Sequence, residues 1–117
     1  MRIFCYGTLK RDGRAHSLIT NYDSEFLGTA VTSVKYSLYN QGGYPGMVVQ
    51  ESENGVTGEL FEVSDECIKA LDRYEGVDCG LFKKETVELS DGSKAMSYLV
   101  GKPYWDDPIT NGIWENK

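Results

Sequence analysis

The chain has few cysteines, a single histidine and no long apolar run. Its three cysteines, Cys5, Cys67 and Cys79, form no Cys-x-x-Cys pair, and His16 lies far from any paired thiols, which argues against a zinc site. No apolar run approaches the roughly 20 residues that cross a bilayer, and no signal-peptide pattern opens the chain. We therefore expect free thiols in a reducing cytoplasm, no metal or cofactor, and no membrane partner.

Positive charge is also scarce. Lysine and arginine number 12 against 18 aspartates and glutamates, so the net charge is −6. A negative surface repels phosphate backbones, which disfavours nucleic-acid binding. A substrate carboxylate would therefore need local help from backbone N–H groups or a few placed cations. With 117 residues, 40% of them hydrophobic, the chain suits one domain with one core, and we expect a monomer or weak dimer.

Turn signals separate short apolar segments along the whole chain. The content of β-branched and aromatic residues predicts strands over residues 2–6, 25–39, 47–50, 56–63, 82–89 and 95–100, and helices over 14–20 and 64–75. Gly28 predicts a bulge, and Asn54-Gly55 and Asp91-Gly92 carry the signal of hairpin turns. The order β-α-β-β-β-α-β-β indicates an α+β fold around a mixed, barrel-like sheet.

The C-terminal segment 101–117 is unusually aromatic for a tail. It contains Pro103, Tyr104, Trp105, Pro108 and Trp114. Such a segment is expected to bury its rings rather than remain free. We therefore expect it to pack on the body, so that residues 1–117 form a single domain.

Glu75 is the most informative single residue. The segment 64–75 predicts a helix that begins after an N-cap serine and ends before Gly76. Ile68 and Leu71 lie seven and four residues before Glu75, so the apolar stripe of the helix runs through the carboxylate. A carboxylate aimed into a core is a candidate proton acceptor. The alternative is that the helix frays at Glu75 and the side chain reaches solvent.

A second candidate site is the loop Tyr6-Gly7-Thr8-Leu9-Lys10, directly after the first predicted strand. Gly7 lets the backbone turn sharply and lets a ligand come close to it. Consecutive N–H groups in such a turn can bind an anion, and Lys10 could add positive charge near the mouth. The spacing of a P-loop is absent. An ordinary exit from a strand is the alternative interpretation.

Several motifs occur in a fixed order. They are Tyr6-Gly7-Thr8-Leu9 after a strand, Tyr44-Pro45-Gly46 before a strand, Gly58-Glu59-Leu60-Phe61 before a helix, Leu71-Asp72-Arg73-Tyr74-Glu75 at its end, and the strand segment Phe82-Lys83-Lys84-Glu85-Thr86-Val87. The ordered set resembles the γ-glutamylcyclotransferase-like family, in particular its AIG2-like and γ-glutamylamine cyclotransferase branch. The resemblance covers about residues 1–100.

The resemblance implies a small mixed β-barrel of about six strands, flanked by two short helices, with a cavity at one side. It implies that Glu75 is the catalytic base and that no cofactor or metal is needed. Tyr44 and Tyr98 could close the pocket, although tyrosines of a sheet are more often packing residues. The residues expected to bind substrate are Tyr6, Gly7, Thr8, Leu9, Tyr44 and Tyr98.

The implied reaction is the cyclisation of a small-molecule γ-glutamyl amine or peptide. Its free α-amine attacks its own side-chain carbonyl and releases 5-oxoproline and an amine. Because the reaction is intramolecular, holding one conformer removes much of the entropic barrier. Glu75 can take the ammonium proton and deliver it to the leaving amine. Backbone N–H groups near residues 7–9 could hold the α-carboxylate or the developing oxyanion.

Other interpretations stay open. His16 is a weaker catalytic candidate than a cap, and Cys5 lacks a histidine positioned to activate it. Asp72 is expected at the surface or as a cap. The aromatic C-terminus after Gly101 departs from the family pattern and motivates a second hypothesis, a non-catalytic module that binds a small ligand or peptide in the same cavity.

Overall fold

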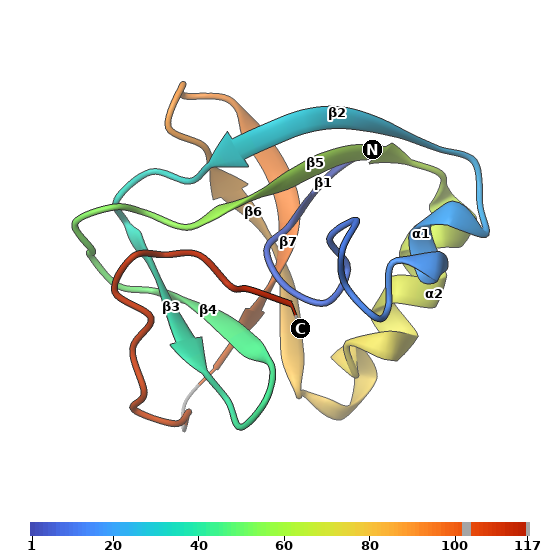
Figure 1. Ribbon diagram of the computed structural model, residues 1–117. Coiled ribbons are helices and arrows are strands. Elements are labelled where there is room, and N and C mark those ends of the chain that lie inside the picture. The colour runs from blue at the N-terminus through green and yellow to red at the C-terminus, as the bar shows by residue number, and fades with distance from the viewer. Residues whose placement is uncertain (102–103, 117) are drawn as a thin grey trace.

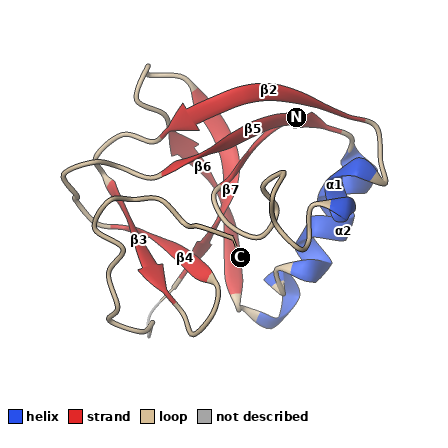
Figure 2. Cartoon of the chain, in the orientation of Figure 1, coloured by secondary structure: helices blue, strands red, loops and turns tan. Residues whose placement is uncertain are grey.

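The computed structural model describes residues 1–101 and 104–116 (Figure 1). Pro103, one of the tail residues named above, lies outside the described part. Both helices lie on one side of the sheet (Figure 2). The strands are β1 (Arg2–Cys5), β2 (Ser24–Val31), β3 (Tyr36–Asn40), β4 (Pro45–Val49), β5 (Thr57–Val63), β6 (Phe82–Glu88) and β7 (Lys94–Val100). The helices are α1 (Ser17–Thr20) and α2 (Asp65–Tyr74), and a single 3-10 turn, η1, covers Val77–Cys79.

The fold is α+β, as expected, with one mixed seven-stranded sheet. Its strands follow the order β2-β5-β1-β7-β4-β3, and β6 pairs with β7. Because β6 occupies one edge of β7 along its whole length, β1 and β4 share the other edge, each as a parallel partner. The pairs are Ile3 with Met96 and Met47 with Leu99. The sheet therefore divides at β7, between the end of β1 and the start of β4.

The predicted closed barrel is wrong for the described strands. A single bridge between Thr32 and Leu89 brings the end of β2 to the end of β6, so the sheet curls toward itself. No ladder follows that bridge, because beyond Val31 the chain turns away to form β3. The count of about six strands falls one short for the same reason. The predicted strand 25–39 is two strands, separated where the Thr32 hydroxyl donates to the Ser33 carbonyl and accepts from the Val56 N–H.

The turn signals had different outcomes. Gly28 forms the predicted bulge, with a φ of 127° and a register shift against β5. The Asp91-Gly92 turn joins the antiparallel hairpin of β6 and β7, as predicted. The hairpin expected at Asn54-Gly55 is absent among the described strands, because β4 pairs with β3 and β7 while β5 pairs with β1 and β2. The dipeptide turns the chain, but the flanking strands separate to different parts of the sheet.

The two helices differ in how well the sequence predicts them. The Ser64 Oγ accepts a hydrogen bond from the Cys67 N–H at 3.2 Å and caps α2, as expected. The first helix is only the single turn α1, because residues 7–16 form successive turns instead. No helix within residues 1–101 and 104–116 is long and apolar enough to span a membrane.

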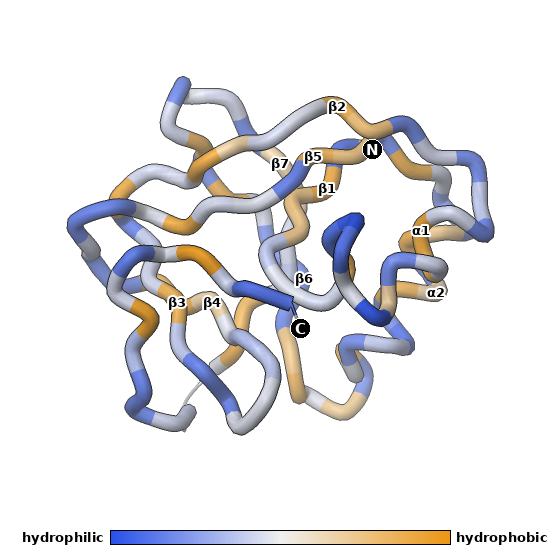
Figure 3. Tube along the Cα trace, in the orientation of Figure 1, coloured by the Kyte–Doolittle hydropathy of each residue, from blue (hydrophilic) through white to orange (hydrophobic). Residues whose placement is uncertain are grey.

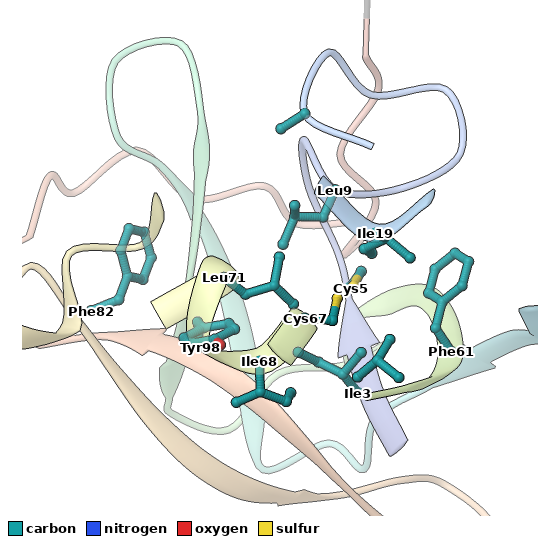
Figure 4. Close-up of a cluster of buried hydrophobic side chains, with 12 residues drawn as sticks. Ile3, Cys5, Leu9, Ile19, Phe61, Cys67, Ile68, Leu71, Phe82 and Tyr98 are labelled. Atoms are coloured by element: carbon teal, nitrogen blue, oxygen red, sulfur yellow. The ribbon is translucent and has the colours of Figure 1, made fainter. Parts of the chain in front are cut away.

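The buried side chains form two clusters, to which alternate residues of β1, β6 and β7 contribute from the two faces of the sheet. One lies between the helices and the sheet and contains Ile3, Cys5, Ile19, Cys67, Ile68, Leu71 and Tyr98 (Figure 4). Cys5 and Cys67 are thus core residues, whereas Cys79 is exposed. The second cluster contains Phe4, Tyr36, Leu38, Met47 and Val87, with Trp114 packed against it. In Figure 3 the helices and β1 carry hydrophobic positions, while the loop after β1 has a hydrophilic outer end.

The C-terminal segment 104–116 contacts two parts of the body. Pro108 bridges to Tyr39 of β3, and the rings of Tyr39 and Tyr104 are 5.0 Å apart. Further on, the Trp114 carbonyl accepts a hydrogen bond from the Lys10 Nζ at 2.7 Å. The segment therefore reaches the loop that follows β1.

Gly58 marks a close approach between β5 and β1. A Cβ at this position would meet the Cys5 carbonyl and lie 2.8 Å from the Phe4 ring. We predict that Gly58→Ala lowers the free energy of unfolding by about 1–3 kcal/mol, because the core must shift to admit the methyl group. Urea denaturation measures the change. Gly101→Ala, where the Cβ meets nothing within 4 Å, is the control and should stay within about 0.5 kcal/mol of the parent. Equal stabilities would contradict the packing argument.

Candidate active site

A cavity of about 240 Å³ opens where the loop after β1, the end of α2 and the strand β7 meet. It is bordered also by the start of β6 and by the turn between β3 and β4. The sequence-predicted residues at its wall are Tyr6, Gly7, Thr8, Leu9, Tyr44, Glu75 and Tyr98. Residues from five separate segments of the chain therefore converge on one concave surface.

Glu75 is the C-cap of α2, and its N–H donates to the Leu71 carbonyl at 2.8 Å. The chain then leaves the helix through Gly76, which has a φ of 65°. The alternative interpretation, in which the helix ends at Glu75, is right about the helix end. The Glu75 side chain, however, lines the cavity instead of escaping to solvent. No described group donates a hydrogen bond to its carboxylate. Burial raises the pKa of Glu75 from 4.5 to about 7.

The loop after β1 folds so that its carbonyls are used internally. The Lys10 N–H donates to the Gly7 carbonyl at 3.1 Å, and the Ala15 N–H donates to the Thr8 carbonyl at 3.0 Å. The N–H groups of Gly7, Thr8 and Leu9 donate to no described residue. All three residues line the cavity, and an anion-binding turn requires N–H groups that are free to donate in this way. Gly7 is needed here because a Cβ would lie 2.6 Å from the Pro45 side chain.

Tyr6 has a structural role that the sequence did not indicate. Its buried hydroxyl donates to the Tyr98 carbonyl of β7 at 2.6 Å and accepts from the Met47 N–H of β4 at 3.1 Å. Both bonds lie where the sheet divides. Burial raises the pKa of the phenol, with a smaller contribution from the nearby charge of Glu75. The ring contributes to the cavity wall, but the hydroxyl is committed to the two strands.

Tyr98 is held by a charged pair that spans α2 and β6. Its hydroxyl donates to the Asp72 Oδ1 at 2.7 Å, and the Asp72 Oδ2 accepts from the Lys84 Nζ at 2.8 Å. Asp72 was expected at the surface or as a cap, so its link to the cavity wall was missed. Its partners lie 12 and 26 residues away, and no local pattern predicts that pairing.

The sequence matches the family described as gamma-glutamyl cyclotransferase, AIG2-like, over residues 3–116. The chain belongs to this family. A Vibrio cholerae protein named "Putative gamma-glutamylcyclotransferase" is 33% identical over 113 residues, which cover 96% of this chain and 93% of that protein.

Two solved structures are also similar to this chain. They are a uropathogenic Escherichia coli-specific protein, with a TM-score of 0.82 and 21% identity, and an AIG2-like protein from Mus musculus, with a TM-score of 0.78 and 23% identity. Each match covers 97% of this chain, with 91% of the first structure and 87% of the second. At these identities the structures support the AIG2-like fold and carry nothing about activity.

The cations near the cavity of this AIG2-like chain are not those expected. Lys10 is engaged with the C-terminal segment, and Arg14 lines the cavity instead. Arg14 is exposed and makes no salt bridge with a described residue. It was missed because the sequence predicts a helix there, whereas the chain is still turning and returns to the cavity edge.

The remaining candidates have mainly structural contacts. The His16 Nδ1 is 2.8 Å from the Leu9 carbonyl, and the ring lies 5.5 Å from that of Phe61. Tyr44 lies against Phe82 at the cavity wall, with a centroid separation of 6.3 Å. Cys5 lines the cavity, and burial raises its pKa, which disfavours a thiolate nucleophile. The described residues contain no group of three His, Cys, Asp or Glu side chains able to hold a metal ion.

The two hydrogen bonds of Tyr6 give a direct test of its role. We predict that Tyr6→Phe lowers the free energy of unfolding by about 2–4 kcal/mol, because it leaves the buried Met47 N–H and Tyr98 carbonyl without their partner. Tyr74→Phe is the matched control, since that hydroxyl is exposed and forms its one hydrogen bond within the described residues with Thr8, and should change stability by less than about 1 kcal/mol. Chemical denaturation compares the two. A Tyr6 variant no weaker than the Tyr74 variant would contradict the assignment.

Proposed function

We propose that the protein is a γ-glutamylcyclotransferase-type enzyme, which converts a γ-glutamyl amine or γ-glutamyl peptide to 5-oxoproline and a free amine. One observation carries the proposal: a mostly buried carboxylate, with a pKa raised to about 7, shares a small cavity with three available backbone N–H groups. Membership in the family supports the same reaction class. Glu75 acts as general acid and base.

The γ-glutamyl group carries one negative and one positive charge, and the cavity offers both kinds of partner. The N–H groups of residues 7–9 are suited to the α-carboxylate, with Arg14 at the edge as an additional cation. Glu75, which lines the same cavity at the end of α2, is suited to the α-ammonium group. Binding both ends of the amino acid holds the chain in a bent conformer, with the amine near the side-chain carbonyl.

The raised pKa of Glu75 suits a proton acceptor. The α-ammonium group of a γ-glutamyl compound is a weaker acid than a peptide N-terminus because a free α-carboxylate stands beside it, so a carboxylate with a pKa of about 7 takes its proton more readily than one with the ordinary pKa of 4.5. The neutral amine then attacks the side-chain carbonyl, forming the ring C–N bond. The protonated Glu75 gives its proton to the departing nitrogen as the original amide C–N bond breaks. The ring nitrogen releases a second proton as it becomes the lactam N–H, and this proton converts the free amine to its ammonium form. The reaction consumes no water and changes no oxidation state.

Replacing the carboxylate tests the role of Glu75. We predict that Glu75→Gln lowers 5-oxoproline release by at least about 100-fold, because the amide cannot take the ammonium proton. A panel of γ-glutamyl amines and dipeptides, with detection of 5-oxoproline, provides the assay. Glu66→Gln, an exposed position on the same helix, is the matched control and should keep its turnover. Retained turnover in the Glu75 variant would refute its assignment.

The same panel separates the enzyme from a binding module on this fold. An enzyme releases 5-oxoproline from at least one compound. If none of the compounds reacts, yet one raises the melting temperature, the non-catalytic module is favoured instead.

The titration of Glu75 predicts opposite effects of pH on activity and stability. The value of kcat/KM should rise with pH through an inflection near 7, as the carboxylate ionises. Between pH 4.5 and about 7 the folded chain binds more protons at Glu75 than the unfolded chain does, so this group makes the free energy of unfolding fall as pH rises.

Comparison with Glu75→Gln isolates the stability effect. The variant lacks this titration, so its melting temperature relative to the parent should increase from pH 5 to pH 8. A difference that is constant with pH would show that Glu75 titrates outside this range.

A further inference from the structure

Three hydroxyl groups at the cavity wall, those of Tyr98, Tyr6 and Ser97, direct their protons into the protein. The Tyr98 hydroxyl donates to Asp72 at 2.7 Å, and the Tyr6 hydroxyl donates to the Tyr98 carbonyl at 2.6 Å. The Ser97 hydroxyl, buried beside them, donates to the Phe4 carbonyl at 2.8 Å. Each of these hydroxyls has one hydrogen, so none has a proton to offer to a ligand in the cavity.

Only one of the three hydroxyls is suited to accept from a ligand. The Tyr6 oxygen already accepts from the Met47 N–H. Ser97 is fully buried, and its hydroxyl group connects β7 to the neighbouring strand β1. Tyr98 lies on the side of β7 that faces α2, next to Leu71, so its oxygen is at the α2 side of the cavity (Figure 4). Glu75 stands one turn beyond Leu71 on the same helix.

Asp72 determines which way the Tyr98 hydroxyl points. A carboxylate can only accept a hydrogen bond, so the phenol must donate to it and present its lone pairs elsewhere. Lys84 holds the second oxygen of Asp72 and keeps a negative charge favourable there. Burial raises the pKa of Tyr98, followed by the hydrogen bond and charge of Asp72 and then the charge of Glu75. The phenol therefore keeps its proton.

We propose that Asp72 is a positioning residue that fixes the Tyr98 hydroxyl as a hydrogen-bond acceptor, and that Tyr98 and Glu75 together bind the α-ammonium group of the substrate. This inference rests on the proposed function and specifies its substrate class. The compound must carry a free α-ammonium group, because a ligand that lacks one leaves both acceptors without a donor.

The arrangement also orients the reacting nitrogen. An ammonium group has three N–H donors and can bond to Glu75 and Tyr98 at once. When Glu75 takes one proton, the resulting amine keeps its bond to the Tyr98 oxygen, and the new lone pair lies along the former N–H direction to Glu75. The amine must then rotate about its Cα–N bond to present this lone pair to the carbonyl, and the remaining N–H to Tyr98 limits that rotation. Tyr98 touches the substrate, whereas Asp72 acts through Tyr98.

Binding to an inactive variant tests the ammonium site without turnover. Two ligands are compared by calorimetry in the Glu75→Gln background: γ-glutamyl methylamide, and glutaric acid monomethylamide, which differs only in lacking the α-ammonium group. Adding Tyr98→Phe should weaken γ-glutamyl methylamide about tenfold, as expected for a hydrogen bond to a charged group, and change the glutaric compound less than about twofold. Equal weakening of both ligands would show a structural effect and overturn the proposal.

A double-mutant cycle tests whether Asp72 acts through Tyr98. Asp72→Asn should weaken γ-glutamyl methylamide about tenfold, because the amide can donate to the phenol oxygen and turn the hydroxyl proton toward the cavity. In the Tyr98→Phe background the same substitution should add less than about a twofold change. Asp65→Asn, an exposed change of the same type on α2, is the control. Additive effects of the two substitutions would overturn the positioning role.

The outcomes separate this inference from the proposed function. If γ-glutamyl methylamide binds with the predicted preference but the parent protein makes no 5-oxoproline from the panel, the ammonium site stands and the reaction fails. If 5-oxoproline forms but neither Tyr98→Phe nor Asp72→Asn changes the preference for the ammonium ligand, the reaction stands and this inference fails. If the parent protein makes no 5-oxoproline from the panel and neither ligand binds to it, both are overturned.

Discussion

The hydroxyl group of Tyr6 joins β7 to β4 at the point where the sheet divides. It donates to β7 and accepts from β4, and it does so from the first residue after β1. Because β1 and β4 share one edge of β7, the Tyr98 carbonyl of β7 and the Met47 N–H of β4 lie where one strand partner gives way to the other. The phenol satisfies both of these groups, and the next residue, Gly7, begins the turn that borders the cavity. The loop after β1, which begins at Tyr6, is thus anchored to the centre of the sheet at its first residue.

The loop after β1 is also held by contacts from distant segments. The Arg11 N–H and guanidinium bond to Glu59 of β5, and the Asn116 side chain donates to the Gly7 carbonyl at 3.1 Å. These contacts engage the Gly7 carbonyl and the Arg11 side chain, while the N–H groups of residues 7–9 have no acceptor among the described residues. A rigid turn with available donors binds an anion without an ordering penalty at that step. The C-terminal segment therefore contributes to the site from outside.

Local patterns predicted the elements that depend on neighbouring residues. The Ser64 cap, the Gly28 bulge and the Asp91-Gly92 hairpin require only short-range hydrogen bonds and backbone freedom, and all three are present. The closed barrel, the hairpin at Asn54-Gly55 and the surface position of Asp72 depended on partners many residues away. The Asn54-Gly55 dipeptide turns the chain, but it carries no information about which strands pair. The helix pattern places Asp72 at the edge of the apolar stripe of α2, but it does not predict that Tyr98 is its hydrogen-bond partner. Candidate site residues were found because loop and helix signals coincide with a family pattern.

The partly buried acidic groups of the site differ in how they are compensated. Asp72 receives hydrogen bonds from Lys84 and Tyr98, and Glu59 receives two from Arg11. Glu75 receives none from a described residue, and the hydroxyl protons of Tyr6, Ser97 and Tyr98 at the same cavity are directed to other acceptors. A buried carboxylate without a donor lowers stability when it ionises, so a purely structural role would leave this position at a disadvantage. A cationic ligand removes the disadvantage by supplying the missing donors, and it does so only when it fills the cavity. The absence of an internal partner for Glu75 is therefore the feature that favours a substrate ammonium group over a packing role.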